Sequence, residues 1–136
     1  MMATDKKIVS VVDDDIYIAK LFHEALRQNF LEIEVRSFTE PVMALEHFTE
    51  NKENFALVIS DLRMVGLNGL ELLKKVKTLN AKVRTILMSA YNFDEDPTYQ
   101  QYMKEQVINS TIEKPVTMNR LYQRVAEELN AYQKTN

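Results

Sequence analysis

Short apolar runs alternate along this chain with segments of helical periodicity, and this alternation restricts the possible folds more than any other feature of the sequence. Five runs have the length and β-branched content of buried strands, at residues 7–12, 33–38, 55–60, 83–88 and 110–113. A segment with apolar residues at helical spacing follows each run, at residues 16–29, from 41 onward, 70–79, about 97–108 and 117 to about 133. Thr39 is the expected N-cap of the second helix, because it comes just before Pro41, a good first-turn residue.

Repeated strand–helix units predict an α/β protein in which right-handed crossovers bury a mostly parallel sheet between helices. The pattern therefore predicts a three-layer, doubly wound (βα)5 sandwich with a five-stranded parallel sheet. At 136 residues the chain has the size of one domain. We expect a single domain over residues 1–136, with its core at about 7–133 and no output domain after the last helix.

Composition excludes several classes of site. The chain has no cysteine, so a disulfide framework, a thiolate zinc site and a cysteine nucleophile are ruled out. The two histidines, His23 and His47, both fall inside predicted helices, which argues against a histidine-based metal site or triad. The net charge of −3 and the lack of a basic stripe argue against direct nucleic-acid binding. No apolar run is long enough to cross a bilayer and residues 1–7 do not resemble a secretory signal, so we expect no membrane association and a cytoplasmic location.

Polar residues with chemical potential follow four of the predicted strands. Asp13, Asp14 and Asp15 follow the first strand, Asp61 the third, Ser89 the fourth and Lys114 the fifth. Ligands of open parallel sheets bind at the carboxyl ends of the strands, so these side chains are expected to meet. Two carboxylates about 4 Å apart repel by roughly 4 kcal/mol at an effective dielectric near 20. The cluster therefore implies a bound cation or a raised pKa, and oxygen ligands favour Mg²⁺, Mn²⁺ or Ca²⁺.

Each of these residues has an ordinary alternative role. The acids at 13–15 could be N-cap and loop residues, Asp61 a loop acid, Ser89 a turn residue and Lys114 a solvated lysine. The ordinary explanation has to hold at four strand ends at once, which favours a common site.

The motifs at these strand ends resemble those of the receiver domains of two-component response regulators. They are Val-Val-Asp-Asp at 11–14, Ser-Asp-Leu-Arg-Met at 60–64, Met-Ser-Ala at 88–90 and Glu-Lys-Pro at 113–115. The resemblance spans nearly the whole chain and implies the flavodoxin-like strand order 2-1-3-4-5. It further implies a phosphoryl-accepting signalling domain that is not an enzyme, apart from catalysing its own phosphorylation and dephosphorylation. A sensor histidine kinase or phosphotransfer protein would be its phosphodonor, and an unidentified protein its downstream target; the oligomeric state is left open.

The resemblance also assigns roles to individual residues. Asp61 would be the phosphoacceptor, and Lys114 and Ser89 would bind the phosphoryl oxygens. Mg²⁺, with Mn²⁺ as an alternative, would be held by Asp13, Asp14, Asp61 and the backbone carbonyl of Arg63. Phosphoryl transfer depends mainly on positioning and charge neutralisation, which a metal and a lysine supply.

The sequence departs from the family pattern at several positions. Val65 replaces the usual proline, and Thr111 occupies the position that usually holds an aromatic switch residue. The stretch between Ser89 and Lys114 is a few residues longer than usual, which suggests an altered fourth loop or helix. Arg63 and Tyr91, two residues after Asp61 and Ser89, are expected to modulate hydrolysis by shielding the phosphoryl group from water.

Two other functions stay open. A phosphohydrolase of the haloacid dehalogenase type would use Asp13 as nucleophile with Asp15 beside it, although Tyr17 and the missing downstream acidic pair do not suit that group. A pseudo-receiver would bind a partner without being phosphorylated, as the absent aromatic switch suggests. Nucleotide-binding loops are not expected, because the chain has only two glycines and no Gly-Lys-Ser/Thr sequence.

Overall fold

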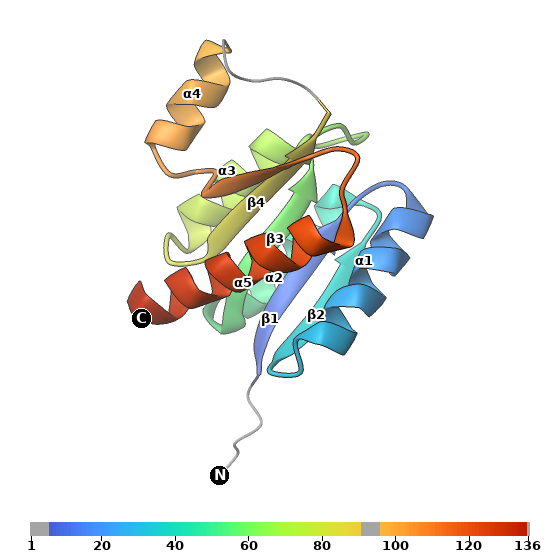
Figure 1. The fold of residues 1–136 in the computed structure, drawn as a ribbon. Coiled ribbons are helices and arrows are strands. Elements are labelled where there is room, and N and C mark those ends of the chain that lie inside the picture. The colour runs from blue at the N-terminus through green and yellow to red at the C-terminus, as the bar shows by residue number, and fades with distance from the viewer. Residues whose placement is uncertain (1–5, 91–95, 136) are drawn as a thin grey trace.

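A five-stranded parallel sheet forms the centre of the molecule (Figure 1). The computed structural model describes residues 6–90 and 96–135. The strands are β1 (Lys7–Val12), β2 (Ile33–Phe38), β3 (Phe55–Asp61), β4 (Arg84–Ser89) and β5 (Ser110–Glu113). Their order is β2-β1-β3-β4-β5, and all four neighbouring pairs are parallel. This confirms the predicted flavodoxin-like α/β fold.

Helices cover both faces of the sheet, as Figure 1 shows. The helices are α1 (Ile16–Asn29), α2 (Pro41–Asn51), α3 (Gly69–Leu79), α4 (Pro97–Lys104) and α5 (Met118–Thr135), and a short 3₁₀ turn, η1, spans Lys52–Asn54. Buried residues of α1 and α5 pack with one face of the sheet in a single apolar cluster. Those of α2 and α3, together with Tyr99 of α4, pack with the other face in a second cluster. None of the helices within 6–90 and 96–135 is long and apolar enough to cross a membrane.

The central strand β3 is buried along its whole length, which fixes the position of the acid at its end. All seven of its residues are buried, because it lies between β1 and β4 and under helices on both faces. Its register pairs Ser60 with Val12 of β1 and Asp61 with Met88 of β4. The carboxyl ends of the three central strands therefore lie side by side, as parallel strand topology requires.

Two helices start at the carboxyl edge of the sheet with well-formed caps. The Asp15 carboxylate accepts hydrogen bonds from the backbone N–H groups of Tyr17 and Ile18, at 2.9 and 3.3 Å. Asn68 and Glu71 form a reciprocal capping box at the start of α3. These caps hold the chain on either side of the acidic residues in defined positions.

The predicted N-cap of α2 and the predicted end of α4 were wrong. The N-cap of α2 is Glu40, without a side-chain hydrogen bond, and not Thr39. Proline disfavours helical backbone in the residue before it, so the helix begins at Pro41 and Glu40 is extended. Helix α4 ends at Lys104 and not near residue 108, because Gln106 adopts a positive φ of 63° that turns the chain toward β5.

Candidate functional site

Three carboxylates meet at the carboxyl edge of the sheet. Asp13 directly follows β1 and Asp61 ends β3, and both side chains are buried, whereas Asp14 is exposed. Each of the three offers an oxygen, and these oxygens all lie within 4.8 Å of one another. A hydrogen bond of 3.1 Å from the Asp13 backbone N–H to the carbonyl of Phe38 ties this point to the end of β2. The predicted convergence of Asp13, Asp14 and Asp61 is therefore present.

Lys114 brings a positive charge to the acids. Its Nζ lies 2.8 Å from Oδ1 of Asp61 and 3.8 Å from Oδ2 of Asp13. Burial acts to lower the pKa of Lys114, but the hydrogen bond to Asp61 and the charges of the aspartates outweigh it and raise that pKa above its ordinary value of 10.5. Lys114 is therefore a permanent cation at neutral pH.

The charged form of Asp13 is buried and only partly compensated by its neighbours. Its Oδ1 accepts a hydrogen bond of 2.9 Å from the backbone N–H of Asp15, but its buried Oδ2 has no hydrogen-bond partner. Burial raises the pKa of Asp13, and the nearby charge of Asp61 adds to this, while the Asp15 N–H and Lys114 act against it. One lysine thus does not neutralise this group of acids, which is the condition under which a divalent cation is favoured.

Ser89 and Arg63 lie beside Asp61 around a small cavity. This cavity, of about 340 Å³, is lined by Asp61, Leu62, Arg63, Ser89, Ala90 and Lys114. A backbone hydrogen bond of 3.0 Å from Lys114 N–H to the Ser89 carbonyl joins the ends of β4 and β5. A small anion in the cavity would lie among a carboxylate, a hydroxyl and an ammonium group.

The remaining candidate residues lie elsewhere. Asp15 caps α1 and is absent from the acid cluster, so its ordinary N-cap interpretation is correct. Thr111 lies in β5, and its carbonyl accepts a hydrogen bond of 3.2 Å from Nε of Arg124 on α5. Val65 is 87% exposed in the loop before α3. Tyr91 and the altered segment after it fall on residues 91–95, outside the described residues.

The arrangement of acids, hydroxyl and lysine agrees with a comparison with known families. Residues 9–126 match the family model described as the response regulator receiver domain. The chain belongs to this family. As the sequence motifs predict, this receiver is a member of the two-component signalling proteins.

This chain matches curated relatives over part of their own length. It is 29% identical over 128 residues to the transcriptional regulatory protein ZraR of Klebsiella oxytoca, covering 94% of this chain and 27% of that protein. It is 30% identical over 83 residues to sporulation initiation phosphotransferase F of Bacillus subtilis, covering 61% of this chain and 64% of that protein. The chain therefore spans about a quarter of the length of the first of these relatives and just under two thirds of the second.

Solved structures share the fold. A response regulator receiver domain protein from Clostridium thermocellum superposes with a TM-score of 0.84 at 23% identity, covering 96% of this chain and 99% of that one. A CheY-like receiver domain protein from Methanospirillum hungatei gives a TM-score of 0.81 at 25% identity, with the same coverage of 96% and 99%.

Proposed function

We propose that this receiver accepts a phosphoryl group on Asp61 from a phosphohistidine of a sensor kinase or phosphotransfer protein. The observation that carries the proposal is the contact of 2.8 Å between Asp61 and Lys114 inside a cluster of three carboxylates. Asp61 also lines the small cavity, which an incoming phosphoryl group can enter. The B. subtilis relative is named as a phosphotransferase, which agrees with this class of chemistry.

The transfer requires positioning and charge neutralisation. An oxygen of Asp61 attacks the phosphorus atom, and the phosphorus–nitrogen bond of the donor breaks with its electron pair returning to the imidazole. The Lys114 ammonium, already paired with Asp61, balances the negative charge on the phosphoryl oxygens. Ser89, which lines the same cavity, supplies a hydroxyl donor to the phosphoryl group.

The acids present fit a divalent cation. Asp13 has a buried oxygen without a hydrogen-bond partner, and Asp13, Asp14 and Asp61 each offer an oxygen within 4.8 Å of the other two. We propose that these residues and the carbonyl of Arg63 hold Mg²⁺, with Mn²⁺ as a substitute. The bound cation would act as a Lewis acid that neutralises phosphoryl oxygen charge.

The haloacid dehalogenase alternative is less well supported by the geometry. Asp13, its candidate nucleophile, is 1% exposed, has one oxygen bound to the Asp15 backbone N–H and is not among the residues that line the cavity. Asp61 lines the cavity and is paired with Lys114. We therefore assign nucleophilic attack to Asp61.

The deciding experiment is intact-mass measurement after incubation with acetyl phosphate and Mg²⁺. We expect one phosphoryl group on the wild-type protein and none on the Asp61→Asn variant. A label that persists in the variant and maps to Asp13 would instead indicate the dehalogenase type. A folded wild-type protein that takes up no phosphoryl group, from acetyl phosphate or from phosphorylated kinase, would indicate a pseudo-receiver that signals by binding alone.

A further inference from the structure

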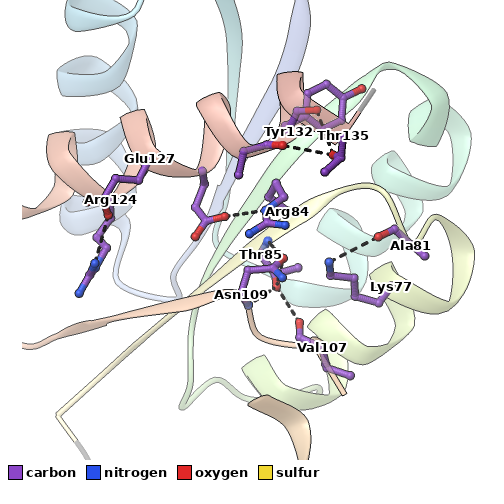
Figure 2. Close-up of polar contacts among 12 residues, drawn as sticks. Lys77, Ala81, Arg84, Thr85, Val107, Asn109, Arg124, Glu127, Tyr132 and Thr135 are labelled. Carbon is purple, nitrogen blue, oxygen red and sulfur yellow. Dashed lines mark hydrogen bonds and ion pairs between the residues drawn. The ribbon is translucent and has the colours of Figure 1, made fainter. Parts of the chain in front are cut away.

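A partly buried lysine lies far from the phosphorylation site, near the opposite edge of the sheet. Lys77 is in the last turns of α3, the helix that begins beside Asp61. Its Nζ donates a long hydrogen bond, of 3.5 Å, to the carbonyl oxygen of Ala81 (Figure 2). An ammonium group has three donors, so this one long contact leaves most of its hydrogen-bonding capacity unused within the protein.

No carboxylate in the described part of the chain forms an ion pair with Lys77. The acid whose charge acts on it is Glu128 of α5, which is itself buried and bound to Arg84 at 2.7 Å. Arg84, labelled beside Thr85 in Figure 2, presents a like charge to Lys77. The contrast with Lys114 is clear, since that lysine has two aspartates within 4 Å.

A small cavity adjoins the side chain. It has a volume of about 270 Å³ and lies between the end of α3 and the segment after α4. Lys74 and Lys77 both line it, together with the Thr78 residue of α3 and with Glu105, Gln106 and Val107. Lys74 also lies over the ring of Tyr102, at 5.5 Å from the ring centroid. Two lysines and one glutamate, Glu105, thus border a space large enough for a small anion, and the lysines outnumber the acid.

We propose that Lys77 is an acyl-acceptor site, at which a small acyl phosphate transfers its acyl group to the side-chain nitrogen. The free amine attacks the carbonyl carbon of the donor, and a nitrogen–carbon bond forms. The bond between that carbon and the bridging phosphate oxygen breaks, and inorganic phosphate leaves with the electron pair and takes up the proton from nitrogen. The product is a neutral amide in place of an uncompensated cation.

The physical reason for reactivity is the unfavourable environment of the charged form. Lysine becomes a nucleophile when it is desolvated or lies beside another cation, because both favour the free amine. Burial lowers the pKa of Lys77 from 10.5 to about 8; the charge of Arg84 adds to this, and that of Glu128 opposes it. The charge of Lys74 favours the anionic phosphate of the donor over a neutral leaving group, and the Glu105 carboxylate in the same cavity opposes this in part.

The test uses the Asp61→Asn protein with a chelator, so that phosphorylation at the carboxylate site cannot occur. The protein is treated with acetyl phosphate at about pH 8, and acetyl groups are mapped by peptide mass spectrometry. Lys75, the exposed neighbour on α3, is the matched internal control. We expect Lys77 to be acetylated roughly tenfold faster than Lys75, since the larger free-amine fraction is partly offset by lower basicity.

Two further measurements distinguish a reactive Lys77 from a lysine that is labelled only because it is accessible. The ratio of Lys77 to Lys75 labelling should fall as the pH is raised to about 10.5, where an ordinary lysine also loses its proton. The ratio should be smaller with an uncharged donor such as phenyl acetate. Equal labelling of the two lysines, or a ratio that does not change with pH, would show that Lys77 only caps the end of α3. A ratio independent of donor charge would overturn the assignment to acyl phosphates. Neither result would affect the proposal for Asp61.

Discussion

The carbonyl oxygen of Asp61 lies against Gly69, 2.3 Å from where the first side-chain carbon of any other residue would stand. The same position would be 2.9 Å from Cδ1 of Leu87. The backbone N–H of Gly69 also donates a hydrogen bond of 2.8 Å to the carbonyl of Leu62. The start of α3 thus holds the backbone of the candidate phosphoacceptor, and the contact is possible only because the residue is glycine.

The first prediction concerns this contact. Gly69→Ala should lower the free energy of unfolding by about 1–3 kcal/mol, because the backbone of β3 or α3 has to shift. The shift should also reduce phosphorylation of Asp61 by acetyl phosphate. Gly66→Ala is the matched control: Gly66 has a φ of +96° but open space around it. That variant should lose stability through backbone strain and keep phosphorylation. Equal phosphorylation in both variants would show that Gly69 does not position Asp61.

The second prediction concerns the repulsion among the acids. The pKa of Asp13 is raised in the folded protein, so the folded state binds more protons than the unfolded one above pH 3.8. Stability is therefore lost as pH rises from 3.8 through the folded-state pKa, and the cost is fully present above that pKa. Without divalent cations, Asp13→Asn should stabilise the folded protein, because a neutral amide removes the burial cost of the charge and the repulsion from Asp61. Urea denaturation at neutral pH measures this, and a loss of stability would contradict the assignment.

The third prediction is that Mg²⁺ stabilises the folded protein. A tenfold excess over its Kd should add about 1.4 kcal/mol to the free energy of unfolding and raise Tm by several degrees. Asp14→Ala should abolish the rise. Asp15→Asn is the control, because asparagine preserves the N-cap of α1 and residue 15 is outside the cluster. If Asp14→Ala retains the Mg²⁺ response, Asp14 is not a ligand.

The fourth prediction concerns His47 and acid. Its ring lies 5.3 Å from that of Phe38 and 5.6 Å from that of Phe55, and its buried Nδ1 has no hydrogen-bond partner. Burial lowers the pKa of His47; Arg36 adds to this, while Glu34 and Glu50 oppose it.

The unfolded protein therefore binds the proton more readily, so the contribution of His47 is present above pH 6.5 and is lost as pH falls through the lower folded-state pKa. The pH dependence of Tm should be flatter in His47→Gln than in wild type over that range. His23→Gln is the control, because the Nδ1 of His23 is hydrogen-bonded to the Ser37 hydroxyl at 2.9 Å. Parallel curves for wild type and His47→Gln would contradict the prediction.

The fifth prediction concerns the lifetime of the phosphoryl group. Arg63 lines the cavity at Asp61, and Tyr91 follows Ser89 by two residues. We propose that both side chains shield the phosphoryl group from water. Replacement of both by alanine should shorten the half-life of phosphorylated protein several-fold, measured by intact mass after removal of the donor. An unchanged half-life would show that neither residue shields the site.

Most of the fold could be predicted because its strand and helix signals are local. The apolar runs and the helical spacing correctly placed all five strands and helices, and the strand-end positions predicted the meeting of Asp13, Asp14 and Asp61. The end of α4 was missed because the turn depends on the positive φ of Gln106, a residue without a strong preference for that conformation. Gly69 lies one residue before the predicted helix 70–79, and only the approach of the Asp61 carbonyl reveals its role.

The sequence by itself determined the alternation of strands and helices and the chemical identity of the residues at the strand ends, because both follow from periodicity and from parallel topology. The tertiary structure alone decided how charge is balanced among those residues. Lys114 reaches Asp61, and Oδ2 of Asp13 is buried without a hydrogen-bond partner. Lys77 is repelled by the charge of Arg84 and has no ion-pair partner among the described residues. These relations depend on burial by residues distant in the chain, and burial is what makes an uncompensated charge costly.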